Sequence, residues 1–130
     1  MEITLDACPD IIFNIDRNRL WQICMNLLTN AVKHTKKGSI WFGYTLEDEG
    51  KMVKFYVSDT GCGIPKDELD NIFARFVQLS DFEQGVGLGL AICKGLVLKM
   101  GGNISVISEE GFGSTFIFTL PMKRPNSWKN

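Results

Sequence analysis

The sequence lacks the features that would point to a nucleic-acid or membrane partner. Its 14 basic and 15 acidic residues nearly cancel, which leaves a formal net charge of −1. Such a balance indicates no basic surface for nucleic acid or for anionic lipid. No apolar run approaches the roughly 20 residues that span a bilayer, and no signal peptide is evident. We therefore expect no nucleic-acid partner and a cytoplasmic domain.

Cysteine is also sparse and unpatterned. The four cysteines are scattered, and no pair of them has the spacing of metal ligands. A disulfide framework is not expected in a chain that is 45% hydrophobic, so reduced thiols are the default. Internal repeats and low-complexity runs are absent as well. The 130 residues predict a single domain with its own core.

The strongest local pattern surrounds Asp59. Apolar and polar residues alternate over 52–58, which predicts a half-buried strand. The same alternation places Asp59 on the apolar side, where a carboxylate is costly unless it finds a hydrogen-bond donor. Gly61 and Gly63 follow, and glycine permits both a sharp turn and the close approach of a ligand. The stretch predicts a site for a flat, donor-bearing ligand; the alternative is an aspartate that caps a tight turn.

A helix is predicted over 18–34, with Asp16 as its N-cap. Its apolar stripe predicts core contacts and consists of Leu20, Ile23, Cys24, Leu27 and Ala31. A second, polar stripe lies about 120° away at roughly 100° per residue and consists of Gln22, Asn26, Asn30 and Lys33. Asparagine is a poor helix former, whereas its amide oxygen suits magnesium. An ordinary solvated face remains the alternative.

The remaining pattern predicts an α+β chain. Strands are expected over 2–5, 9–15, 39–46, 103–108 and 114–120, a short helix over 65–71 and a loop over 77–85. The strands over 39–46 and 52–58 should form an antiparallel hairpin. Residues 122–130 are predicted to be a loose tail after a domain that occupies residues 1–121.

A glycine-rich turn, Gly85 to Leu90, opens into a helix predicted over 88–100. Such a turn presents free N–H groups and the positive end of the helix dipole, which suits phosphate. Its spacing differs from the dinucleotide fingerprint, and no Gly-Lys-Ser/Thr follows as in a P-loop.

Taken together, these segments resemble the ATP-binding domain of sensor histidine kinases, in the group that also contains gyrase, the heat-shock chaperone and mismatch-repair ATPases. Residues 26–35 resemble the N box of that family, and residues 59–64 its first glycine box. Residues 72–76 resemble its phenylalanine box, residues 85–90 its second glycine box and residues 111–116 its closing hairpin. The resemblance covers about residues 11–121. It implies a two-layer α/β sandwich of the Bergerat type, with helices on one face of a mixed, mostly antiparallel sheet.

The resemblance also implies the ligands, ATP and Mg²⁺, and the residues that bind them. Asn30 would ligate magnesium with Asn26 beside it, and Lys33 would contact phosphate; these three are the expected catalytic residues. His34 would lie against the nucleotide, Asp59 would accept from the adenine amino group, and Gly61, Gly63 and Ile64 would border the base. Arg75 and Phe76 would border the lid, and the phosphates would meet Gly85, Gly87, Leu88 and Gly89.

By the same resemblance, the function is transfer of the γ-phosphoryl group to a histidine on a separate dimerisation domain. The only histidine, His34, lies in the N-box helix, so the chain alone is not expected to autophosphorylate. Expected partners are the phosphoacceptor helix of the parent kinase and a receiver domain; the isolated domain should be monomeric, and a membrane anchor in the parent is left open. The alternatives are an ATP-driven clamp, which needs an acidic residue where Asn26 stands, and a non-catalytic nucleotide sensor.

Three departures from the family pattern accompany these expectations. The lid over 77–87 looks short, and Val86 should stiffen the phosphate loop. Cys62 stands between the two glycines, either as a reactive thiol or simply as a small residue.

Overall fold

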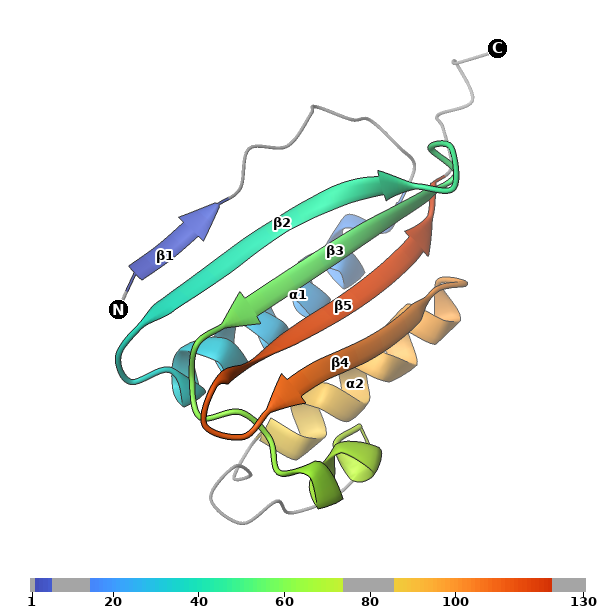
Figure 1. Ribbon diagram of the computed structural model, residues 1–130. Coiled ribbons are helices and arrows are strands. Elements are labelled where there is room, and N and C mark those ends of the chain that lie inside the picture. Colours follow the sequence, from blue (N-terminus) through green and yellow to red (C-terminus); the bar gives the residue numbers. More distant parts are fainter. Residues whose placement is uncertain (1, 6–14, 74–85, 123–130) are drawn as a thin grey trace, which may run out of the picture.

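The computed structural model describes residues 2–5, 15–73 and 86–122, and the findings below concern those ranges. Figure 1 shows two layers, a five-stranded sheet and two long helices that cover one of its faces. The elements in chain order are β1 (Glu2–Leu5), α1 (Arg17–His34), β2 (Ser39–Glu47), β3 (Met52–Asp59), the 3₁₀-helix η1 (Lys66–Asn71), α2 (Val86–Lys99), β4 (Asn103–Glu109) and β5 (Gly113–Pro121).

The sheet is mixed and mostly antiparallel, as predicted. Its strand order is β1-β2-β3-β5-β4, in which only the β1–β2 pair is parallel. The predicted hairpin of β2 and β3 is confirmed, and β4 and β5 form a second hairpin. Pairing of β3 with β5 joins the two hairpins and sets Asp59 opposite Ser114. The expected fold class, a two-layer α/β sandwich, is therefore confirmed.

The core lies between the sheet and the two helices. Every second residue of β3 and β5 is buried, so the period of two in the sequence corresponds to one covered and one open face. Phe55 and Phe118 stack across the β3–β5 pair with ring centroids 4.8 Å apart. Ile23 and Leu27 of α1 are fully buried against the same layer. This packing holds the C-terminal half of α1 over the end of β3.

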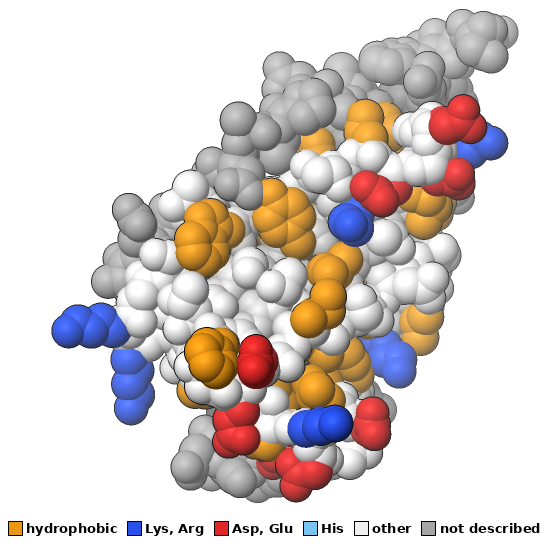
Figure 2. All heavy atoms as spheres, in the orientation of Figure 1, with side chains coloured by type: hydrophobic (Ala, Val, Ile, Leu, Met, Phe, Trp, Pro, Cys, Tyr) orange, Lys and Arg blue, Asp and Glu red, His pale blue; other side chains and the backbone are white. Residues whose placement is uncertain are grey.

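Figure 2 shows the face of the sheet that the helices leave open. Hydrophobic side chains lie there in separate groups between polar atoms. Within the described ranges, no helix is long and apolar enough to cross a membrane.

Several element boundaries differ from the sequence prediction. Asp16 is the N-cap of α1 and accepts a hydrogen bond from the Arg19 N–H at 3.2 Å, as expected, although the helix begins at Arg17. The short helix over 65–71 is a 3₁₀-helix that begins after Pro65, whose extended backbone (ψ 140°) places it outside the first turn. Ile15 lies in no strand. The rest of the strand predicted over 9–15, the loop over 77–85 and the tail beyond Met122 fall outside the described residues.

Candidate functional site

Three parts of the chain that carry predicted site residues meet at one end of the molecule (Figure 1). They are the C-terminal half of α1, the loop after β3 and the first turn of α2. The Cys62 N–H donates to the His34 carbonyl at 3.2 Å, which ties the loop to the end of α1. A Cβ on Gly89 would stand 4.0 Å from the side chain of Asn26, so α2 begins beside α1.

Asp59 is the buried carboxylate of this region. Only 6% of the residue is exposed, and its Oδ1 accepts a hydrogen bond from the Gly61 N–H at 2.8 Å. Burial raises the pKa of this carboxyl group, while the Gly61 and Ser114 N–H groups and the Thr35 hydroxyl act in the opposite direction. A buried acceptor held by backbone donors is suited to taking one further donor from a ligand. The prediction that Asp59 lies on the covered face is confirmed.

The two glycines after Asp59 are packed against the chain itself. A Cβ on Gly61 would overlap the His34 carbonyl oxygen, and a Cβ on Gly63 (φ +73°) would overlap the Glu109 carbonyl oxygen. The loop is also fastened to the β4–β5 hairpin, because the Gly111 N–H donates to the Cys62 carbonyl at 2.7 Å. The space next to these glycines is thus occupied by backbone. Close approach of a nucleotide base at Gly61, Gly63 and the buried Ile64 stays a prediction.

The polar stripe of α1 is not uniformly solvated. Asn30 is 5% exposed, and its Oδ1 is buried without a hydrogen-bond partner among the residues described. A buried amide oxygen without a partner is costly unless a ligand or an ion satisfies it. Asn26 is partly exposed and lies beside Gly89, whereas Gln22 and Lys33 are exposed. For Asn30, the alternative of a solvated face is therefore wrong.

An unpaired amide oxygen is a ligand type that Mg²⁺ accepts. Within the described ranges, no group of three or more His, Cys, Asp or Glu side chains could hold a metal ion. A magnesium site here would therefore depend on Asn30 and on oxygens supplied by the ligand. Such a site fits the usual pattern for magnesium, which keeps most of its waters and binds through few protein groups.

His34 and the start of α2 complete the described part of the site. Burial, together with the charge of Lys33, lowers the pKa of His34, which keeps the imidazole neutral at pH 7. The helix α2 begins at Val86, two residues earlier than predicted, so Gly87 to Gly89 belong to its first turn. First-turn N–H groups have no acceptor within their own helix and are available to an anion. Arg75, Phe76 and Gly85 lie outside the described residues.

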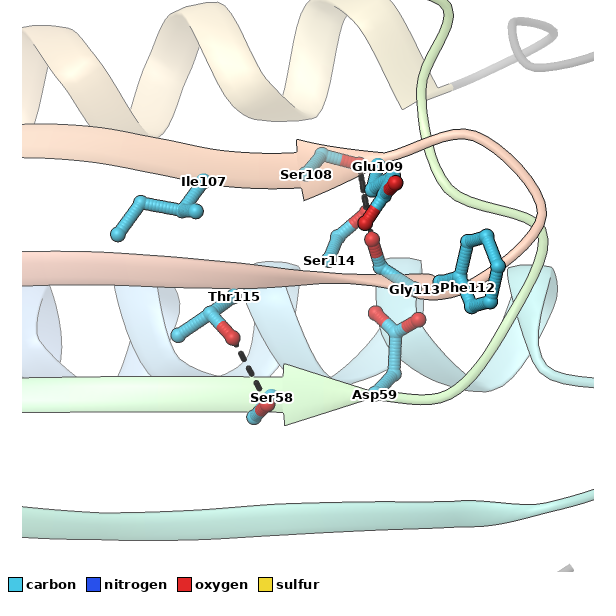
Figure 3. A pocket seen from close by; sticks show the side chains of 9 residues that line it. All are labelled: Ser58, Asp59, Ile107, Ser108, Glu109, Phe112, Gly113, Ser114 and Thr115. Atoms are coloured by element: carbon cyan, nitrogen blue, oxygen red, sulfur yellow. Dashed lines mark hydrogen bonds between the residues drawn. The ribbon is translucent and has the colours of Figure 1, made fainter.

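A shallow cavity of about 490 Å³ lies at the ends of β3, β4 and β5 (Figure 3). Among the predicted site residues that the structure describes, only Asp59 lines it. Two hydroxyl pairs, Ser58 with Thr115 and Ser108 with Ser114, are each joined at 2.8 Å. The first pair joins β3 to β5 next to Asp59, and the second joins the two strands of the β4–β5 hairpin.

Sequence reasoning missed three polar residues of this region. Ser108 Oγ accepts from the Ile64 N–H at 2.8 Å, and the Ser114 N–H faces the Asp59 carboxylate. Thr35 is 1% exposed and also acts on Asp59. The small polar residues of the β4–β5 hairpin were visible in the sequence, but their proximity to Asp59 follows from the β3–β5 pairing. Thr35 had no local signal beyond its place at the end of the helix.

Comparison with known proteins shows that most of the chain matches one family. The family model described as histidine kinase-, DNA gyrase B-, and HSP90-like ATPase matches residues 15–124. The aerobic respiration control sensor protein ArcB of Escherichia coli K12 is 47% identical over 125 residues, which cover 92% of this chain and 16% of ArcB. The adaptive-response sensory kinase SasA of Synechococcus elongatus is 43% identical over 111 residues, or 84% of this chain and 29% of SasA.

Two solved structures share the fold. Full-length ShkA in complex with AMPPNP superposes with a TM-score of 0.85 and 39% identity, over 95% of this chain and 26% of that one. The nucleotide-free catalytic domain of the histidine kinase ThkA gives a TM-score of 0.76 and 31% identity, over 94% and 79%. The chain thus spans less than a third of ArcB, SasA and ShkA, but most of the ThkA catalytic domain.

Proposed function

Because the chain belongs to the histidine kinase-, DNA gyrase B- and HSP90-like ATPase family, we propose that it binds Mg-ATP and transfers the γ-phosphoryl group to a histidine on a separate domain. The observation that carries the proposal is that two buried acceptor groups, the carboxylate of Asp59 and the amide oxygen of Asn30, lie at the same end of the molecule. Asp59 offers an acceptor held by backbone N–H groups, and Asn30 offers an amide oxygen without a partner in the described chain. The first suits a base with an exocyclic amino group, and the second suits a divalent cation.

In phosphoryl transfer, different residues of α1 would bind the metal ion and contact the phosphates. This reaction depends on neutralising phosphate charge and on in-line positioning more than on covalent help from the protein. Bound Mg²⁺ would neutralise charge on the phosphate oxygens. Asn30 would hold the ion, with Asn26 beside it, and the exposed Lys33 one turn later would contact a phosphate. The first-turn N–H groups of α2 would bind the remaining phosphate oxygens.

The identity of residue 26 supports transfer over hydrolysis. An amide cannot remove a proton from water, so Asn26 would not act as a general base. With no activated water at that position, the acceptor would be a protein side chain. We propose that the acceptor histidine lies on a dimerisation helix of the parent protein, and that a response-regulator receiver domain accepts the phosphoryl group next. In this arrangement the domain itself would be a cytoplasmic monomer.

The substitution Asp59→Asn tests the recognition of adenine. Asparagine turns part of the acceptor site into a donor, so the ligand amino group would meet an N–H group. Losing one hydrogen bond to a charged acceptor should cost about 1.5–3 kcal/mol, roughly a 10- to 150-fold loss of ATP affinity. Titration calorimetry with ATP and GTP measures the effect. The control is Asp67→Asn on exposed η1, which should bind like the unmodified chain; an unchanged preference for ATP over GTP in Asp59→Asn would count against the assignment.

The substitution Asn30→Ala tests the magnesium site. We expect the unmodified chain to bind an ATP analogue tightly only with magnesium, and Asn30→Ala to lose most of that dependence. Gln22→Ala is the matched control, because Gln22 lies on the same stripe of α1 but is exposed. Titrations with and without Mg²⁺ distinguish the variants. If Asn30→Ala kept the full magnesium dependence, the ion would have to be held elsewhere.

A further inference from the structure

Thr35 is a buried polar residue to which neither the expected site nor the family pattern gives a role here. It is the C-cap of α1, with its N–H directed at the Val32 carbonyl at 3.4 Å. The residue is 1% exposed, and its hydroxyl is buried without a hydrogen bond of ordinary geometry to any described residue. A helix cap exposed to water would satisfy its hydroxyl with solvent. This one needs a partner inside the protein.

The Asp59 carboxylate is the neighbour that can supply that partner. The methyl group of Thr35 lies toward Gly38, 3.6 Å from where a Cβ would stand there. The end of α1 meets this carboxylate, because a Cβ on Gly61 would overlap the His34 carbonyl oxygen and stand 2.9 Å from Asp59 Oδ1. The Thr35 hydroxyl lowers the pKa of Asp59, as the N–H groups of Gly61 and Ser114 also do. A carboxylate has about four acceptor positions. Two backbone donors and one hydroxyl leave room for one donor from outside.

We propose that Thr35 is a positioning residue for base recognition: its hydroxyl donates to the inner side of the Asp59 carboxylate and turns the remaining acceptor position toward the ligand. The proposal rests on the proposed function, in which Asp59 accepts from the ligand amino group. Thr35 would act on the ligand only through Asp59, because the residue is 1% exposed and its hydroxyl is buried. The Thr35 hydroxyl would form a hydrogen bond of ordinary geometry to the Asp59 carboxylate once the carboxylate binds the amino group of the ligand.

This arrangement explains why the end of an otherwise regular helix carries a buried hydroxyl. Without the hydroxyl, one side of the carboxylate would face only apolar atoms of residue 35. The carboxylate would then turn more freely about its last torsion, which is broad for aspartate. A loosely held acceptor gives a weaker hydrogen bond to the ligand, since preorganisation is lost. The effect should therefore appear only for ligands that carry the amino group.

The experiment compares two nucleotides that differ in that group. ATP and purine riboside triphosphate, which lacks the amino group, are titrated by calorimetry into the unmodified chain and into Thr35→Val, Thr35→Ser and Asp59→Asn. The ratio of the two affinities reports the strength of the bond between the amino group and Asp59. For a charged acceptor we expect the unmodified chain to prefer ATP by about tenfold or more. Urea unfolding of each variant confirms that it is folded.

In Thr35→Val we expect this ratio to fall by about threefold or more, with the affinity for the amino-free nucleotide unchanged. Thr35→Ser keeps the hydroxyl and should keep the ratio. If Thr35→Val does not fold, Thr35→Ala removes the hydroxyl with less bulk, and the same fall is expected. A purely structural role predicts that both affinities fall together at constant ratio, and this result would overturn the proposal.

The Asp59→Asn variant distinguishes an error in the role of Thr35 from an error in the assignment of Asp59. If its ratio collapses while that of Thr35→Val does not, the role of Thr35 is wrong and the assignment of Asp59 stands. If the unmodified chain binds both nucleotides equally, Asp59 does not recognise the amino group, and both assignments fail.

Discussion

Replacing Gly63 with alanine should destabilise the protein and disrupt the site, because the structure leaves no space for the added methyl group. In the structure Gly63 has φ +73°, and a Cβ would overlap the Glu109 carbonyl oxygen and lie 2.8 Å from its carbon. Real Cβ atoms essentially never come within 3.0 Å of such atoms. The neighbours are backbone, so they cannot rotate aside as a flexible side chain could. The loop after β3 and the β4–β5 hairpin would have to separate.

A second glycine provides the control for backbone strain. Gly50, in the turn between β2 and β3, has φ +83°, and a Cβ added there would meet no described atom within 4 Å. A left-handed conformation costs alanine about 1–2 kcal/mol, and the loss of freedom in the unfolded chain returns about 0.4–1 kcal/mol. Gly50→Ala should therefore destabilise the protein by about 0–1.6 kcal/mol.

Gly63→Ala carries the same strain and two further losses. Forcing extra atoms into a packed region costs about 1–3 kcal/mol. Separating the loop from the hairpin also weakens hydrogen bonds such as Gly111 N–H to the Cys62 carbonyl, worth about 0.5–1.5 kcal/mol each. The total is about 1.5–6 kcal/mol, a large part of the stability of a domain of this size.

Urea unfolding followed by tryptophan fluorescence measures both variants, and titration with ATP measures what remains of the site. We expect Gly63→Ala to be the less stable by about 2 kcal/mol or more and to bind ATP weakly. Equal stability of the two variants would refute the steric argument. If Gly63→Ala were as stable as Gly50→Ala yet failed to bind ATP, approach of the ligand rather than chain packing would be the reason for glycine.

Two further predictions follow from the titrating groups. Burial raises the pKa of Cys24 to about 12 and that of Cys93 to about 11. Burial also raises the pKa of Cys62, but Cys62 is the exposed thiol of the three. Iodoacetamide at pH 8 should therefore label Cys62 ahead of the other two, as peptide mapping by mass spectrometry would show. Equal labelling of all three in folded protein would contradict the packing of α1 on α2. Burial raises the pKa of Asp59 above its ordinary value of 3.8, so the folded state binds the carboxyl proton more tightly than the unfolded state. The contribution of protonated Asp59 to the free energy of unfolding is therefore lost as the pH rises from 3.8 through the raised pKa. Urea unfolding over this window should show that Asp59→Asn removes this loss in the ligand-free protein, and identical pH profiles for the two proteins would argue against a buried, ionised carboxylate.

Much of the local structure could be predicted from the residues themselves. The alternation over 53–57 extended to Asp59 and correctly placed a carboxylate on the covered face, since side chains alternate along any strand. Asp16 was correctly predicted to begin α1, because a cap is a contact over three residues. The α+β class and both hairpins followed from similar short-range patterns, together with the family resemblance. Ligand contacts of the individual site residues stay predictions.

The relations between distant segments required the tertiary structure. No local pattern predicted that β3 pairs with β5, or that this pairing sets Ser114 beside Asp59. The packing of Gly61 and Gly63 on the carbonyls of His34 and Glu109 could not be predicted either, because glycine in the sequence suggested a sharp turn and room for a ligand. Asn30 was ambiguous on its helix until burial left its amide oxygen without a partner in the described chain. Periodicity and helix capping involve residues only a few positions apart, so they can be predicted from the sequence. The burial of a polar atom depends on which distant segments pack around it, and only the folded chain determines that.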